Sequence, residues 1–189
     1  MTAAVLVLAL AALVDDPATS YIFPAGGQRG TTVDCRVGGL NLSGECGFRV
    51  LGAGLDAPAT IRSMPTLILP GPHYQNPIAQ QPFDYPQDLA ARIRISADAP
   101  PGVRYWYCTT SEGATQLRVF VVGDLPEVLE DERKTRQGRP QKIALPVTVN
   151  GRIYPRGDLD EYEFAAKAGD FLNCEVLSKR LGHRIDARL

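Results

Sequence analysis

The sequence has no excess of charge and few histidines, and these scarcities exclude several classes of protein. It contains 20 Lys and Arg residues against 21 Asp and Glu residues. A nucleic-acid binder needs clustered positive charge to contact phosphates, so this balance argues against one. The two histidines, His73 and His183, lie outside any H-E-x-x-H motif, and G-x-S-x-G and G-x-x-x-x-G-K motifs are missing. We therefore predict a non-catalytic chain without a nucleotide cofactor.

Long apolar runs are also scarce. The longest, Ala3–Val14, is shorter than the roughly 20 residues of a membrane-spanning helix, so no transmembrane span is predicted. An N-terminal apolar run of this length is typical of a secretory signal, although Met1 and Thr2 supply no basic residue before it. We interpret residues 1–18 as a signal peptide cleaved between Ala12 and Ala18, and a buried strand is the alternative. The expected location is secreted, periplasmic or at the cell surface.

Gly and Pro are plentiful, at 18 and 15 residues, and favour short strands joined by turns. We predict an all-β fold. Seven strand-like segments fall within residues 20–123, which suits an immunoglobulin-like (Ig/TIG-like) β-sandwich. The segments are Tyr21–Phe23, Thr31–Val37, Phe48–Leu51, Thr66–Leu69, Arg92–Ser96, Val103–Thr110 and Leu117–Val122. Turns are expected at Gly26-Gly27, Gly38-Gly39 and Gly52–Gly54, and Gln87–Ala91 is expected to form one helical turn.

The four cysteines form no C-x-x-C pair, which argues against a zinc ribbon or a thioredoxin-type redox site. Export would permit disulfides. Alternation in Thr31–Gly38 places Cys35 on the inward face of a strand, so a bridge from Cys35 to Cys108 would join two sheets. A bridge from Cys35 to Cys46 across a Gly-rich hairpin is the competing pairing. Buried free thiols are the third interpretation.

The composition changes abruptly after the first seven strand candidates. Residues 124–142 are strongly charged, and we interpret them as a linker. Alternation then resumes, with a turn at Lys167–Asp170 leading into Phe171–Leu177 and predicting a hairpin. Residues 143–189 are too few to enclose a core of their own. We predict an incomplete second β-sandwich over these residues.

Part of this second region resembles a known family. The segments Leu145–Ile153, Gly157–Phe164 and Arg180–Gly182, with their order and spacing, resemble the first half of a bacterial pre-peptidase C-terminal (PPC) domain. The resemblance implies a jelly-roll-like β-sandwich truncated here, whose remaining strands would follow Leu189. It also implies a non-catalytic accessory module of a large exported bacterial protein, in which an Ig-like or TIG-like module often precedes this domain.

Acidic residues near the junction suggest a calcium hypothesis, because carboxylate oxygens are the ligands that calcium prefers. Asp158 and Asp160, together with Glu130 and Glu132, form the candidate set. The resemblance supports it, since related domains of secreted peptidases bind calcium near this junction. The basic run Arg133–Arg136 departs from the family pattern and would repel a cation. The alternative is that Asp158 and Asp160 only shape a turn.

Aromatic residues supply a binding hypothesis. Tyr105, Trp106 and Tyr107 are consecutive in a predicted strand, so at least one ring must point away from the core. Tyr74 and Tyr85 lie in a Pro-rich loop. We take Trp106, Tyr74 and Tyr85 as candidate ligand-binding rings that would stack on sugars or peptides. The alternative is that these rings fill the core and anchor the loop.

Together these features predict a non-catalytic module that binds or presents protein or carbohydrate ligands. Its partners would be other domains of the same larger protein and extracellular protein or polysaccharide. Two alternatives remain open. The chain would be a prodomain or accessory fragment of a secreted hydrolase whose catalytic domain lies outside it, or it would be a purely structural spacer.

Overall fold

The computed structural model describes residues 16–64, 87–131, 138–153 and 159–182. Within these ranges the regular structure consists of β-strands and one short 3₁₀ turn at Lys179–Leu181, with no α-helix. The all-β prediction is confirmed. The predicted signal region before Asp16 and the predicted strand Thr66–Leu69 lie outside the described residues.

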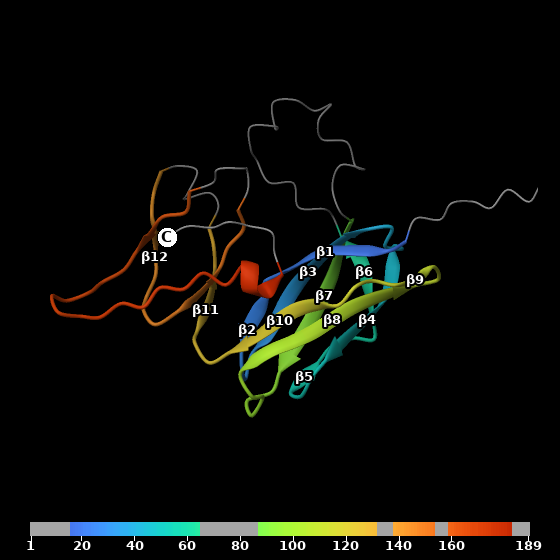
Figure 1. The fold of residues 1–189 in the computed structure, drawn as a ribbon, viewed down its shortest axis with the longest axis horizontal. Coiled ribbons are helices and arrows are strands. Elements are labelled where there is room, and N and C mark those ends of the chain that lie inside the picture. The colour runs from blue at the N-terminus through green and yellow to red at the C-terminus, as the bar shows by residue number, and fades with distance from the viewer. Residues whose placement is uncertain (1–15, 65–86, 132–137, 154–158, 183–189) are drawn as a thin grey trace, which may run out of the picture.

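The main sheet contains ten strands, all within the first two thirds of the chain (Figure 1). They are β1 (Ala18–Phe23), β2 (Gly26–Gln28), β3 (Thr32–Leu40), β4 (Glu45–Leu51), β5 (Leu55–Asp56), β6 (Thr60–Met64), β7 (Gln87–Ile95), β8 (Gly102–Thr110), β9 (Gly113–Ala114) and β10 (Arg118–Gly123). Eight of them follow the order β1-β3-β7-β6-β4-β8-β10-β2, and β5 and β9 pair at the side.

The sheet curls until its two ends nearly meet. The end strands β1 and β2 are consecutive in the chain, and the Phe23-Pro24 bond between them is cis. β1 pairs antiparallel with β3, whereas β2 pairs parallel with β10. The Gln116 amide and the Arg118 guanidinium donate hydrogen bonds to the Thr19 carbonyl oxygen, both at 3.1 Å. These bonds link β10 and the segment just before it to β1 across the remaining gap.

Strict alternation of apolar residues forms the core inside this curled sheet. In β7 the side chains of Leu89, Ala91, Ile93 and Ile95 are buried, while the residues between them are exposed. Such period-two patterns are expected for a strand with one face packed on the core and the other exposed to solvent. Every member of the core cluster lies between Ile22 and Val122.

Three local predictions are wrong, and in each case a tertiary contact determines the backbone conformation. Gln87–Ala91 is the start of β7 and not a helical turn, since it pairs with β3 and β6. Gly38-Gly39 lies inside β3, where a Cβ on Gly38 would sit 2.2 Å from the Tyr21 ring. Gly26-Gly27 is strand β2, and a Cβ on Gly26 would meet the Val121 carbonyl oxygen at 2.5 Å. The glycines therefore permit close packing, not turns.

The second region, residues 124–182, forms two short parallel pairs. β11 (Glu127–Leu129) pairs with β13 (Thr148–Asn150), and β12 (Gln141–Lys142) pairs with β14 (Tyr162–Glu163). Two of these strands thus lie within the predicted linker. The turn at Lys167–Asp170 is confirmed by the bond from the Asp170 amide to the Lys167 carbonyl, 3.1 Å.

The predicted strand Phe171–Leu177 is not formed, so the predicted hairpin is wrong. No described strand lies beside this segment to pair with it, and its side chains are exposed, with Phe171 fully accessible. Apolar alternation is present in the sequence, but without a partner strand and a facing sheet it produces no regular structure.

Candidate functional site

Strand β8 separates aromatic residues onto its two faces. Arg104, Trp106 and Cys108 point inward and are buried, whereas Val103 and Tyr105 point outward and are nearly half exposed. The prediction that at least one ring of the aromatic triplet points away from the core is confirmed. Trp106 lies two residues before Cys108, and this spacing was the signal in the sequence that the two side chains share one face and that Tyr105 lies on the other.

The outward side chains of β4, β8 and β10 form one continuous surface. Leu51 and Val119 lie opposite Tyr105 on the two neighbouring strands, and Val121 lies opposite Val103. Leu51, Val103 and Tyr105 are each more than 40% exposed. We call this surface the apolar outer face, and it consists of Leu51, Val103, Tyr105, Tyr107, Val119 and Val121.

The structure places Trp106 in the core, and this corrects its interpretation as a ligand-binding ring. The side chain is inaccessible to solvent, its ring centroid lies 5.9 Å from that of Phe48, and its Nε1 donates to the Val119 carbonyl oxygen at 3.2 Å. No face of the ring is left for a ligand. The other two candidate rings, Tyr74 and Tyr85, lie outside the described residues.

Three of the four cysteines are buried, and none of the four is bridged. Cys35 points inward as predicted, its thiol donates to the Val33 carbonyl oxygen at 3.7 Å, and burial raises its pKa to about 12. The thiol adjacent to Cys108 belongs to Cys46, and the interaction of the two thiols together with burial raises the pKa of Cys108. The pairing hypothesis of Cys35 with Cys46 required a hairpin, but β3 and β4 are not neighbours in the sheet.

Two of the four predicted calcium ligands, Asp158 and Glu132, lie outside the described residues. Glu130 is buried, and its Oε2 accepts a hydrogen bond from the Arg152 amide at 2.8 Å. Asp160 is partly exposed. Across the described ranges no three His, Cys, Asp or Glu side chains gather as a metal site would require. The calcium site stays a prediction.

A buried charged network lies beside β1. The Asp88 carboxylate is inaccessible to solvent and accepts a bond from Arg36 at 2.9 Å and a second from the Tyr21 hydroxyl. Burial, followed by the hydrogen bond to Asp88, raises the pKa of Tyr21. The bonds from Tyr21 and Arg36 to Asp88 join β1, β3 and β7, so we interpret this network as structural.

The second region contacts the first at the junction of β1 and β2. The Asn150 side chain accepts a bond from the Ala25 amide at 3.1 Å and donates to Glu127 Oε2 at 2.6 Å. Arg152 lies over the Phe23 ring, 4.4 Å from its centroid. Burial raises the pKa of Glu127, and the bond from Asn150 partly opposes that rise. Sequence reasoning missed this polar junction because its partners are far apart in the chain.

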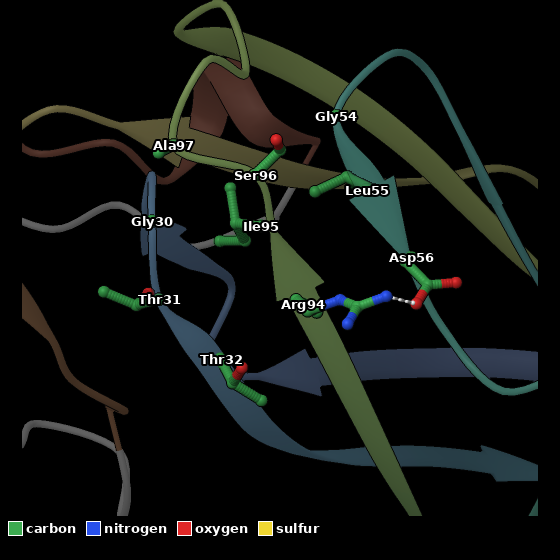
Figure 2. A pocket seen from close by; sticks show the side chains of 10 residues that line it. All are labelled: Gly30, Thr31, Thr32, Gly54, Leu55, Asp56, Arg94, Ile95, Ser96 and Ala97. Carbon is green, nitrogen blue, oxygen red and sulfur yellow. Dashed lines mark hydrogen bonds and ion pairs between the residues drawn. The ribbon is translucent and has the colours of Figure 1, made fainter.

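A shallow pocket of about 560 Å³ lies where the β2–β3 turn meets the ends of β5 and β7 (Figure 2). Thr31, Thr32, Leu55 and Ser96 contribute to its lining. Its charged residues neutralise each other, since Arg94 Nη2 lies 2.5 Å from Asp56 Oδ2 and both side chains are exposed. The pocket thus offers no buried polar group to orient a ligand, unlike most ligand sites.

Comparison with known proteins adds no family to this geometry. No protein-family model matches the chain, and no curated protein matches it in sequence. Within the described residues, no helix has the length and apolar character needed to cross a membrane. The apolar outer face is therefore the candidate site with the most support from the structure.

Proposed function

We propose that this chain is a non-catalytic binding module of a larger exported protein, and that its apolar outer face docks against a protein surface. The single observation that carries this proposal is the continuous row of exposed and partly exposed apolar and aromatic side chains across β4, β8 and β10. Aromatic residues are enriched and charged residues depleted at the centre of protein interfaces. Contiguous exposed apolar surface on a folded domain marks such sites.

The neighbours of Tyr105 favour a protein partner over a sugar. A sugar-binding ring works together with nearby hydrogen-bonding groups that fix the orientation of the hydroxyls. The cross-strand neighbours of Tyr105 are Leu51 and Val119, which offer none. Arg49, opposite Tyr107, borders the face, and its Nη1 already donates to the Ala59 carbonyl at 2.9 Å. An apolar centre with charge at the rim is the arrangement of a protein interface.

The first region is, in this proposal, an Ig-like sandwich. The run β1-β3-β7-β6 corresponds to the A-B-E-D sheet of that fold, and β4-β8-β10 corresponds to its C-F-G sheet. The parallel pairing of β2 with β10 supports the assignment, because it makes β1 and β2 the two halves of one N-terminal strand divided between the sheets. The apolar outer face then covers the outside of the C-F-G sheet.

The second region is, in this proposal, an incomplete PPC-like sandwich that attaches the module to the rest of an exported protein. Its exposed apolar side chains support incompleteness, since Leu159 is 71% exposed and Phe171 is fully accessible. The family resemblance of Leu145–Ile153 and Gly157–Phe164 supports the assignment. The apolar run Ala3–Val14 supports export.

The test compares the whole chain with variants that remove apolar surface at matched sites. Immobilised protein is exposed to extracellular protein fractions, and captured proteins are identified by mass spectrometry. The double variant Leu51→Ser/Tyr105→Ser removes the centre of the apolar outer face. The control Leu40→Ser removes a side chain that is 50% exposed at the end of β3, in another part of the sheet.

We expect one protein to be captured by the parent chain and by Leu40→Ser, with at least a tenfold loss for the double variant, which equals about 1.4 kcal/mol. Unchanged capture by the double variant would reject the face as the site. If soluble polysaccharide competes with capture, and the double variant no longer binds that polysaccharide, the ligand of this face is a sugar and not a protein. Loss of self-association measured by sedimentation would identify the partner as a second copy.

A further inference from the structure

The core of the first region contains two thiols placed against each other by strand register. Phe48 of β4 lies directly opposite Cys108 of β8, and Cys46 precedes Phe48 by two residues on the same inward face. Cys46 is therefore the diagonal neighbour of Cys108. Both side chains are at most 3% exposed. The neighbouring Cys108 thiol lowers the pKa of Cys46, while burial opposes that change, and the pKa of Cys108 is raised in turn.

We propose that Cys46 and Cys108 form a disulfide bridge between β4 and β8 when the protein folds under oxidising conditions, and that Cys35 stays a buried thiol. The oxidant is a donor disulfide, such as that of a thiol–disulfide oxidoreductase or glutathione. The Cys46 thiolate attacks a donor sulfur and releases one donor thiol. The deprotonated Cys108 sulfur then attacks Cys46 Sγ in the mixed disulfide and releases the second. Two protein thiols lose two electrons and two protons, and the donor disulfide becomes two thiols.

The geometry of neighbouring strands favours this pairing. Diagonal neighbours on an antiparallel pair lie about 7–8 Å apart between Cα atoms, and a disulfide spans up to about 6.8 Å. A relative shift of the two strands by about 1 Å thus closes the bridge. Cys35 has a different setting, because β3 does not pair with β8 and the Cys35 thiol is hydrogen-bonded to the Val33 carbonyl oxygen.

Burial determines when the bridge forms. A donor disulfide cannot reach Cys46 or Cys108 once β4 and β8 are packed, so exchange takes place during folding or transient opening. Cys174 is exposed in the second region and supplies an internal reference for thiol access. In the reduced folded chain, Cys174 reacts with an alkylating reagent and the three buried cysteines are protected.

The sequence allows a direct test on the whole chain. Each cysteine falls on its own tryptic peptide: Gly30–Arg36 for Cys35, Val37–Arg49 for Cys46, Tyr105–Arg118 for Cys108 and Ala168–Lys179 for Cys174. The denatured, reduced protein is refolded in a buffer of reduced and oxidised glutathione. Remaining thiols are alkylated, and the unreduced digest is mapped by mass spectrometry.

We expect the peptides Val37–Arg49 and Tyr105–Arg118 to be joined, with Cys35 alkylated after denaturation. A Cys35→Ser variant keeps the bridge, and a Cys108→Ser variant leaves Cys46 alkylated. The only tryptophan, Trp106, lies two residues before Cys108 on the same face, so its emission falls on oxidation and recovers on reduction. Gly30–Arg36 joined to either partner, or four alkylated cysteines after refolding, would overturn the proposal, whatever the variants do.

Discussion

The two regions of this chain contain similar apolar residues and use them in opposite ways. In residues 18–123 the large apolar side chains converge, and Trp106, Phe120, Leu89 and Ile93 are inaccessible to solvent. In residues 124–182 the buried side chains of the described residues are the polar Glu130 and Gln141, while Leu159 and Phe171 face solvent. The difference teaches that alternation alone does not build a core. A strand must also have a hydrogen-bonded neighbour and a facing layer.

The largest effect is expected from truncating the centre of the first core. Trp106→Ala removes the largest inaccessible side chain and its contact with Phe48, and we expect a loss of about 3–5 kcal/mol in the free energy of unfolding. Chemical denaturation followed by circular dichroism measures it. The matched change in the second region, Phe171→Ala, should leave stability unchanged because that ring has no packing to lose. Equal losses of stability in the two variants would contradict the conclusion that only the first of the two regions has a packed apolar core.

Strands β3 and β7 are joined by one buried and one exposed ion pair, so the contributions of the two pairs to stability can be compared directly. Asp88→Asn removes the charge of a buried carboxylate that is paired with the part-buried Arg36, and we expect a loss of about 3 kcal/mol in unfolding free energy. The control is Asp34→Asn, which breaks the ion pair with Arg92 across β3 and β7 where both side chains are about 70% exposed. Solvent screens that pair, so little change is expected. Urea denaturation of both variants measures the contrast.

These contrasts also show how far the sequence predicts the fold. Strand-like segments around Cys35 and Cys108 correctly predicted β3 and β8, and alternation correctly predicted the inward direction of Cys35. It did not predict that Asp88 would occupy a buried position, because its partners Tyr21 and Arg36 are distant in the chain. It also did not bring Cys46 next to Cys108, since neighbours across a sheet depend on strand order, which local spacing does not set.

The junction between the regions is expected to depend on one side chain. Asn150→Ala removes the acceptor for the Ala25 amide and the donor to Glu127, which weakens docking of β11 and β13 by about 1–2 kcal/mol. Amide hydrogen exchange should accelerate at Val128 and Val149, and amides of β7 and β8 should be unaffected. Asn41→Gly, which removes an asparagine bond to the Asp16 carbonyl far from the junction, is the control. Faster exchange throughout the main sheet would mean that the regions fold as one unit.

The smallest effect, and the one that most sharpens the comparison, concerns the charge of Glu127. Burial raises the pKa of this carboxyl above its ordinary value of 4.5, so the folded junction binds a proton more tightly than the unfolded chain does. Protonation of Glu127 therefore stabilises the docked junction. This stabilisation is fully present below pH 4.5 and is lost as the pH rises through the raised pKa of the folded state. Glu127→Gln keeps an oxygen to accept the bond from Asn150 and cannot ionise, so its junction should not weaken with pH. We expect a change smaller than that of Asn150→Ala, measured as the pH dependence of exchange at Val128 and Val149 after correction for intrinsic rates. An identical pH dependence in the variant would assign it to another group, and among the described residues burial would then control an ionisation in the first region and not at the junction.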